Sequence, residues 1–338
     1  MIIVRPIRSS DYDALHQIAI ESGHGFTSLP VNEELLLNRI NGANQSFHKQ
    51  TNFDGNESYL FVMEDSETGE VVGTSGIEAA VGLNDAFYHY HVGKVVHSSR
   101  ELNIYNNIDV LSLNNDYTGA SELCTLFLRN SYRANNNGRF LSKVRFLFMA
   151  EHPQRFNSTV IAEMRGVSDE NGNSPFWQWL EEHFFSMDFP TADYLTGIGK
   201  KAFIAELMPK YPIYVSLLSK EAQQVIGQVH KDTVPALRLL EREGFVSRGY
   251  VDIFDAGPTV ECELTNIKTV RTSERYQVAI GEVSDAERHM VINQDVQNFR
   301  AVYQPVRTDI DSKIATISTE TAKALQVNAG DIIRLAKA

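Results

Sequence analysis

The sequence predicts a protein of the α/β (α+β) class, with a mixed β-sheet flanked by helices and a smaller β domain at the end of the chain. Three observations predict this. Strand-like and helix-like patterns alternate over most of the chain. An apolar strand at Glu122–Leu128 runs through an Asn-rich turn into a helix. From about Lys268 the pattern changes to short β-type runs, so we expect two domains, residues 1–267 and 268–338.

The composition is that of an ordinary soluble globular protein, with 338 residues, 43% of them hydrophobic and 22% charged. The start of the chain lacks a basic segment followed by a long apolar run, and no stretch of about 18 apolar residues follows, so we expect a cytoplasmic protein without a membrane span. Cys124 and Cys262 are expected to be small buried residues in a reducing compartment, with a nucleophile as the alternative. A net charge of -12 argues against a nucleic-acid partner and suits a cationic small substrate.

The first elements follow from local patterns. Ile2–Ile7 has the pattern of a strand, and Ser10 with Asp13 resembles a capping box at the start of a helix. Two apolar runs, Ser58–Met63 and Val71–Ile77, flank the turn-rich segment DSETGE, which predicts a β-hairpin. A long insertion then precedes the next strand.

The segment from Ser121 to Ser142 carries the strongest functional signal. Its apolar residues recur at helical spacing after Gly138, which predicts an amphipathic helix beginning there. The first N–H groups of that helix and its dipole would attract a phosphate, so the turn could hold a pyrophosphate. Arg133, Asn136 and Gly138 form an RxxNxG pattern in this turn. The alternative is a polar helix-start loop that binds nothing.

Later elements complete the prediction. We expect a strand at Thr159–Met164, a helix at Phe176–Phe185, a helix within Asp232–Phe245 that ends at Gly244, and a strand at Tyr250–Phe254. The short β-type runs of the tail are Tyr276–Ile280, Ala301–Tyr303, Ala315–Ile317 and Asp331–Leu335. The end of the chain, STETAKALQVNAGDIIRLA, predicts a short helix, a glycine turn and a final strand, as in small β-barrels.

Two motifs resemble the GNAT superfamily of N-acetyltransferases. The RxxNxG turn is similar to the Q/RxxGxG/A loop with which that superfamily holds the pyrophosphate of coenzyme A, with Asn136 in place of the middle glycine. Asn tolerates a left-handed backbone better than most residues, so the loop could still close. Ala236, Leu239, Gly244 and Phe245 resemble the AxxLxxxxGF ending of the same fold. The resemblance implies an acetyltransferase-like mixed sheet that is splayed at its centre to admit an acyl thioester.

Longer blocks resemble the arginine N-succinyltransferase family over nearly the whole chain. These blocks include GFTSLPVNEE, GIEAAVGL, SELCTLFL, AEMRGVSDENGNSPFW, ADYLTGIGKKAFIAELMP, VIGQVH and GYVDIFDAGPTVE. The resemblance implies attack of the arginine α-amine on succinyl-CoA, which gives N2-succinyl-L-arginine and coenzyme A. Succinyl-CoA would be a co-substrate, with no permanently bound cofactor, and the chain is expected to form oligomers.

The resemblance also implies roles for single residues. His230, the histidine of VIGQVH, would be the acid for the leaving thiolate, with a helix-capping histidine as the alternative. Leu126 would contact succinyl-CoA through its backbone. Glu122, four positions earlier on the same strand face, is a candidate for deprotonating the amine through water, with a structural ion pair as the alternative.

Acceptor binding is less defined by the sequence. A guanidinium requires a carboxylate partner, and the substrate carboxylate requires a donor. The candidates in the family-like blocks are Glu78, Glu163, Arg165 and Asp252, none of which the sequence singles out. We expect Phe26 and Thr27 to line the acceptor pocket, with an ordinary surface loop as the alternative.

The sequence leaves three alternatives to consider. His89, His91 and His97 could suggest a metal, but no cysteine or acidic ligand completes a recognisable spacing, so we expect no metal site. The acceptor could be ornithine or another cationic amino acid instead of arginine. A non-catalytic acyl-CoA-binding subunit of the same fold is the third alternative.

Overall fold

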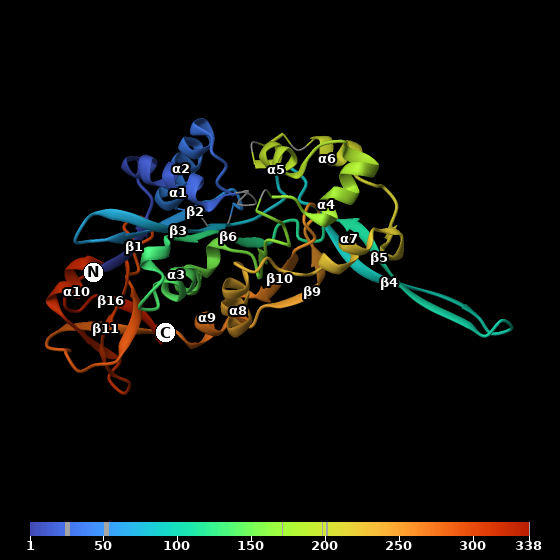
Figure 1. The fold of residues 1–338 in the computed structure, drawn as a ribbon. Coiled ribbons are helices and arrows are strands. Elements are labelled where there is room, and N and C mark those ends of the chain that lie inside the picture. Colours follow the sequence, from blue (N-terminus) through green and yellow to red (C-terminus); the bar gives the residue numbers. More distant parts are fainter. Residues whose placement is uncertain (24–27, 51–53, 171, 198, 201, 338) are drawn as a thin grey trace.

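The computed structural model describes residues 1–23, 28–50, 54–170, 172–197, 199–200 and 202–337. Within these residues, sixteen strands join one mixed sheet, with helices on both of its faces (Figure 1). The strands are β1 (Ile2–Pro6), β2 (Ser58–Asp65), β3 (Glu70–Glu78), β4 (His89–Ser99), β5 (Ile104–Asn114), β6 (Ser121–Leu128), β7 (Thr159–Glu163), β8 (Ile213–Tyr214), β9 (Val246–Val251), β10 (Pro258–Glu263), β11 (Glu274–Ile280), β12 (Arg288–Ile292), β13 (Ala301–Pro305), β14 (Arg307–Asp309), β15 (Ile314–Ile317) and β16 (Ile332–Lys337).

The helices lie between these strands in an order that confirms the predicted class. They are α1 (Tyr12–Ser22), α2 (Glu33–His48), α3 (Asn137–Glu151), α4 (Pro175–Leu180), α5 (Phe189–Gly197), α6 (Ala202–Leu207), α7 (Lys220–Val225), α8 (Val234–Glu243), α9 (Lys268–Thr272) and α10 (Thr319–Leu325). Helices α1 and α2 cover one face of the central strands, and α3 with α8 and α9 covers the other (Figure 1). None of the described helices has the length and apolar character needed to cross a bilayer.

The central sheet is splayed, as predicted. Strand β6 pairs with β3 along its length, but it pairs in parallel with β7 only at Ser121–Val160 and Glu122–Ile161. Beyond Glu122 the two strands separate. At the start of the open part, Thr125 has a left-handed backbone with φ 55°, and the register with β3 shifts. A β-branched residue adopts this conformation only where the surrounding structure imposes it, so a β-bulge marks the opening.

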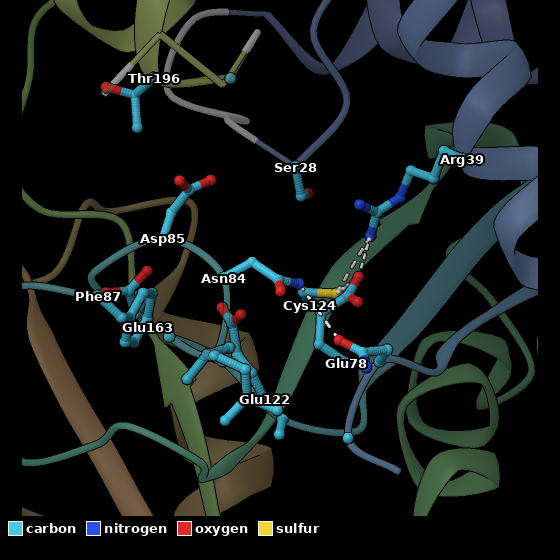
Figure 2. Close-up of a pocket in the computed structure, with 17 residues that line it drawn as sticks. Ser28, Arg39, Glu78, Asn84, Asp85, Phe87, Glu122, Cys124, Glu163 and Thr196 are labelled. Atoms are coloured by element: carbon cyan, nitrogen blue, oxygen red, sulfur yellow. Dashed lines mark hydrogen bonds and ion pairs between the residues drawn. The ribbon is translucent and has the colours of Figure 1, made fainter. Parts of the chain in front are cut away.

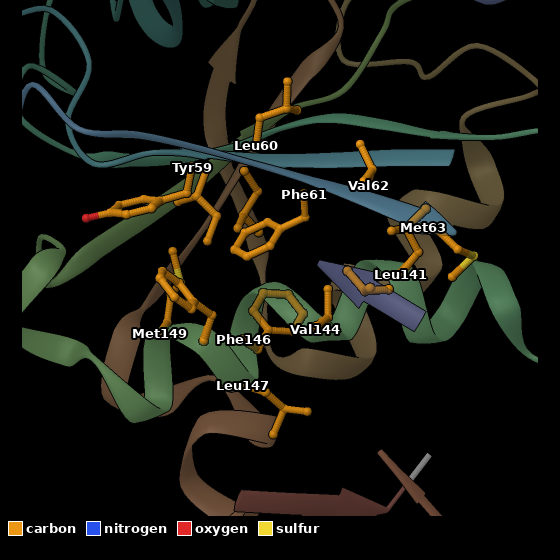
Figure 3. Packing of buried hydrophobic residues seen from close by; sticks show 14 of the residues in the cluster. Tyr59, Leu60, Phe61, Val62, Met63, Leu141, Val144, Phe146, Leu147 and Met149 are labelled. Carbon is orange, nitrogen blue, oxygen red and sulfur yellow. The ribbon is translucent and has the colours of Figure 1, made fainter. Parts of the chain in front are cut away.

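Helix α3 packs under β2 and is buried on all sides, which corrects the prediction of an amphipathic helix. Tyr59 and Phe61 of β2 point toward it (Figure 3), and the Phe61 and Phe148 rings meet edge to face at 5.2 Å. Lys143 is buried because α9 and C-terminal strands cover the face that the sequence assigns to solvent, and Arg145 is buried toward the sheet, where its Nη1 donates to the Cys124 carbonyl of β6 at 3.4 Å. Lys143 pairs with Glu243 at 3.3 Å.

Two other local predictions were wrong. The strand expected at Tyr250–Phe254 ends at Val251, because the Asp252 carboxylate accepts hydrogen bonds from the amides of Phe254 and Asp255 and turns the chain. Ser10 and Asp13 do not form the cap of the first helix. The Arg8 amide instead donates to Asp11, and α1 begins at the next residue.

The C-terminal strands β11 to β16 and α10 form the predicted small β unit, which ends with a helix, a turn at Gly330 and strand β16. Its strand β13 pairs with β1, so the unit continues the central sheet. At the opposite end of the molecule, β4 and β5 form a long hairpin that projects from the body (Figure 1). This hairpin is the long insertion that the sequence places between β3 and β6.

Candidate active site

A cavity of about 430 Å³ lies beside the point where β6 and β7 separate. The strands contribute Glu78, Glu122, Cys124 and Glu163, and Arg39 enters from α2 (Figure 2). The segment from Ala80 to Phe87, the loop residues Ser28, Gly55 and Asn56, and the end of α5 at Thr196 and Gly197 complete the lining.

Sheet register explains why three carboxylates meet here. Glu78 of β3 is the partner of Glu122 of β6, and Glu122 is the partner of Ile161 of β7. Paired residues of neighbouring strands point to the same face, and Glu163 follows Ile161 by two positions, so all three glutamates share one face of the sheet. The Glu78 carboxylate accepts hydrogen bonds from Ser58 Oγ at 2.9 Å and from Arg39 Nη2 at 3.0 Å.

The cavity is strongly acidic. Among the described residues that line it, four carry carboxylates and Arg39 is the one cation, which gives a formal charge of -3. The carboxylates are Glu78, Asp85, Glu122 and Glu163. Such a site favours a ligand with more than one positive charge and opposes an anion that lacks a cationic partner.

Cys124 is held as a neutral thiol within this cavity. Burial, opposed by the nearby Arg39 guanidinium, raises its pKa to about 12, and Glu78 and Glu122 add to the rise. The thiolate required for nucleophilic attack is therefore scarce at neutral pH, which argues against the nucleophile alternative.

His89 lies behind the cavity, fully buried, with Nε2 2.9 Å from Glu163 Oε1. Burial lowers the pKa of His89 to about 4, against the opposing effect of Asp252 and Asp116, so the ring is neutral at neutral pH. His91 packs on Tyr250 and His97 on Tyr214. The described part of the chain holds no group of three His, Cys, Asp or Glu side chains placed to bind a metal.

The turn before α3 has the backbone that the sequence predicts. Asn136 is left-handed with φ 64°, so asparagine replaces the glycine of the usual pattern. Helix α3 begins at Asn137, one residue before the predicted start, and Gly138 lies in its first turn. Arg133 donates from Nε to the Leu128 carbonyl at 2.9 Å, which fixes the turn to the end of β6.

Leu126 follows the bulge at Thr125 on β6, where the strand has left β7, and its side chain is half-buried against the core. Its backbone therefore lies at the opening of the sheet, as the resemblance implies.

His230 lies beside the segment that follows β7, and backbone hydrogen bonds join it to that segment. Its amide donates to the Arg165 carbonyl at 2.9 Å, next to a bridge between Gly166 and Val229. The Asp232 amide donates to His230 Nδ1 at 3.2 Å. Burial and the Arg165 charge lower the pKa of His230, which favours a neutral ring. Because Nδ1 accepts the Asp232 amide, the ring proton lies on Nε2.

The structure thus brings some predicted residues together and leaves others apart. Glu78, Glu122 and Glu163 line one cavity, whereas Leu126, Arg133, Asn136, Gly138 and His230 are outside its lining, along the opening of the sheet and the adjoining turns. Arg165 and Asp252 are outside the lining too. Phe26 and Thr27 lie outside the described residues, although the next residue, Ser28, lines the cavity.

The sequence analysis missed Asp85 of the cavity lining and, with more consequence for the chemistry of the site, Arg39. It follows the apolar run Leu35–Leu37 in α2, where a charged residue has the pattern of a solvated helix face. Its place in the site becomes evident only in the folded structure, because its contacts are with strands β3 and β6.

Comparison with known proteins identifies the family of this chain. Residues 2–269 match the family model described as arginine N-succinyltransferase beta subunit, and residues 274–337 match that of the C-terminal domain of this subunit. The chain is 50% identical to the arginine N-succinyltransferases of Escherichia coli strains 55989 and K12 over 339 residues, which cover 100% of this chain and 98% of each relative. The solved structure of arginine/ornithine succinyltransferase subunit AI from Pseudomonas aeruginosa matches with a TM-score of 0.91 at 38% identity, covering 100% of this chain and 98% of that one. The chain belongs to the arginine N-succinyltransferase family.

Proposed function

We propose that this protein transfers the succinyl group of succinyl-CoA to the α-amine of L-arginine, giving N2-succinyl-L-arginine and coenzyme A. Full-length similarity to enzymes of this name supports the reaction. The observation that carries it is the acidic cavity beside the opening between β6 and β7. L-Arginine carries a guanidinium and, before it reacts, a protonated amine, so it matches the charge of this cavity.

The three glutamates on one sheet face are our candidates for binding the acceptor. Glu163 and Glu78 lie on either side of Glu122 across strands β7, β6 and β3. A guanidinium pairs best with carboxylates, and carboxylates on three neighbouring strands suit a ligand that carries two separated positive groups. We keep Phe26 and Thr27 as proposed pocket residues because Ser28 beside them lines the cavity.

Glu122 is our candidate for removing the proton from the α-amine through water. It is the last residue of β6 that pairs with β7, so its carboxylate lies where the strands begin to separate. The amine must be neutral to attack, and a positioned general base contributes roughly 10²- to 10⁴-fold in rate.

The donor would lie along the opened edge of β6. We propose that the first turn of α3, with Asn136, Gly138 and Arg133, holds the pyrophosphate of succinyl-CoA, and that the Leu126 backbone contacts the acyl-pantetheine portion. His230 would donate from Nε2 to the departing sulfur, because its Nδ1 accepts the Asp232 amide.

Turnover with purified protein tests this proposal. Release of coenzyme A is followed with a thiol reagent, with succinyl-CoA or acetyl-CoA as donor and L-arginine or L-ornithine as acceptor. We expect turnover with succinyl-CoA and L-arginine, and little with acetyl-CoA. A better rate with ornithine would change the acceptor, and binding of succinyl-CoA without turnover by any amine would mean a non-catalytic subunit.

Two broader predictions also stand as proposals. We propose that residues 1–267 form the acyltransferase domain and residues 268–338 an accessory β domain. We also propose an oligomer, since the related Pseudomonas protein is described as a subunit. Sedimentation velocity measures the oligomeric state directly.

A further inference from the structure

The guanidinium of Arg39 is incompletely satisfied where it meets the cavity. Its Nη2, which carries two hydrogens, lies within hydrogen-bond distance of three acceptors among the described residues, Glu78 Oε1 at 3.0 Å, Thr125 Oγ1 at 2.8 Å and Cys124 Sγ at 3.4 Å. Among the described residues, the buried Nε has no hydrogen-bond partner. Figure 2 shows the side chain reaching from α2 across the cavity toward β6.

An unsatisfied N–H of a buried guanidinium is costly, since such donors are almost always paired in folded proteins. Glu78 offers only partial compensation, because its Oε1 also accepts from Ser58 Oγ. A planar guanidinium binds a carboxylate best through two N–H groups at once. The buried Nε is closed to a ligand, but Nη1 is not among the buried atoms and donates to no described residue, so a carboxylate in the cavity would find its donor there.

The position of Arg39 distinguishes between the two substrate carboxylates. Its contacts fall on Cys124 and Thr125, the residues immediately before Leu126 on β6. In the proposed function this strand carries the donor. The distal carboxylate of a succinyl group lies about 4 Å from the thioester carbon, from C–C bonds near 1.5 Å. Arg39 is thus close to where an acyl chain of four carbons would end.

We propose that Arg39 binds the distal carboxylate of the donor acyl group and so selects a dicarboxylic monothioester over a neutral acyl chain of equal length. The inference rests on the proposed succinyl transfer. It also resolves an electrostatic conflict. A cavity whose described lining carries four carboxylates repels an anionic acyl chain, and Arg39 is the cation among those residues that can offset this repulsion.

The experiment compares succinyl-CoA with butyryl-CoA, which has the same number of carbons and no charge. We expect wild-type kcat/KM with L-arginine to favour succinyl-CoA strongly. Arg39→Met should lower the ratio of kcat/KM for succinyl-CoA to kcat/KM for butyryl-CoA about 10²-fold, whatever its effect on acceptor binding, which is common to both donors. Arg39→Lys should recover part of the loss, since it restores charge without the bidentate geometry. Arg307→Met, at an exposed arginine on β14, is the matched control and should behave as wild type.

Several results would overturn the inference. One is a wild-type enzyme that uses both donors equally well, which requires no variant. Another is an Arg39→Met variant in which the ratio of kcat/KM for succinyl-CoA to kcat/KM for butyryl-CoA is that of wild type. If Arg39→Met does not fold, the same result in Arg39→Lys would count. A third is an Arg39→Met variant that no longer prefers L-arginine over agmatine, which lacks the α-carboxylate, but keeps the wild-type preference for succinyl-CoA over butyryl-CoA. Arg39 would then bind the carboxylate of the acceptor.

Failure of the proposed function gives a different pattern. If wild-type protein turns over neither donor with L-arginine, titration calorimetry with succinyl-CoA and butyryl-CoA still tests Arg39. Tighter binding of succinyl-CoA that disappears in Arg39→Met would support the inference even then, and equal affinities would overturn it.

Discussion

At the scale of single residues, burial decides whether a side chain in the cavity is charged. Cys124 is the clearest example, since its sulfur lies among Arg39, Thr125 and Glu78. The guanidinium would favour a thiolate, but burial outweighs it and the net effect raises the pKa to about 12. The sulfur therefore acts as a small neutral packing group.

Replacing Cys124 by serine should therefore leave kcat within about threefold of wild type, because at pH 8 only about one thiol in 10⁴ would be ionised. The steady-state rate with succinyl-CoA and L-arginine measures this, together with the rate of alkylation by iodoacetamide, which we expect to be far below that of a free thiol. A loss of activity above 10²-fold with normal folding would show that the sulfur takes part in the reaction.

His230 permits a test that separates its two ring nitrogens. Asparagine can replace Nδ1 as acceptor of the Asp232 amide, whereas glutamine can place a donor near Nε2. We expect His230→Asn to lower kcat about 10²- to 10³-fold with little change in succinyl-CoA affinity, and His230→Gln to retain more activity. Presteady-state release of coenzyme A and calorimetric titration provide the readouts. Equal activity of both variants would point to a structural role.

At the scale of elements, the extension of β7 positions His230. Gly166 pairs with Val229, and its amide also donates to Asp255 at 2.6 Å. Gly257 packs directly against this extension, where an added Cβ would lie against the Met164 carbonyl and 2.5 Å from the Gly166 amide. Only backbone occupies this space, so neighbouring atoms cannot rotate away.

Gly257→Ala should therefore destabilise the protein by about 3 kcal/mol or more, and it should also lower kcat because the segment that carries His230 must move. Denaturant unfolding measures the first effect and the coenzyme A assay the second. Gly42→Ala in α2 is the control: among the described residues, no atom outside the backbone of the helix itself lies within 4 Å of its added Cβ, so helix propensity alone should stabilise it by up to about 1 kcal/mol. Similar unfolding free energies for the two variants would contradict this packing.

Elements that depend on local backbone preferences could be predicted from the sequence, whereas contacts between distant segments could not. The hairpin of β2 and β3 and the turn before α3 were predictable, because turn residues and Asn136 act through local backbone preferences. Burial of Lys143 was not, because distant segments cover that face of α3. The same limit applies to the site. Glu122 could be named from one strand, but its grouping with Glu78 and Glu163 depends on register across three strands, and Arg39 depends on how α2 packs.

At the scale of the whole molecule, the C-terminal unit and the central sheet share one core. Met290, Ile292, Phe299 and Ala301 belong to the same buried cluster as the aromatic residues of β2 and α3. The Phe299 ring lies 5.3 Å from that of Phe61 and 5.2 Å from that of Phe148. We expect the unit to contribute to the stability of the catalytic part through this shared core, whatever else it binds.

Stability of the whole chain should fall in mild acid because of buried histidines. Burial lowers the pKa of His152 to about 4, whereas an unfolded histidine has a pKa near 6.5. Between these values the unfolded state binds more protons, so stability falls as pH drops from about 6.5 toward 4. The loss from His152 is about 2 kcal/mol at pH 5. His152→Phe should flatten the pH dependence of the unfolding free energy between pH 7 and 5, and parallel curves would contradict this assignment.

Identification of the product tests directly whether this protein joins a succinyl group to the α-amine of L-arginine. Purified protein is incubated with L-arginine and succinyl-CoA labelled with ¹³C in the succinyl group, and the product is analysed by NMR and tandem mass spectrometry. We expect an amide between the labelled carbonyl and the α-nitrogen, with one coenzyme A released per amide. Labelled succinate as the sole product, or an acyl group on a guanidinium nitrogen, would contradict this expectation.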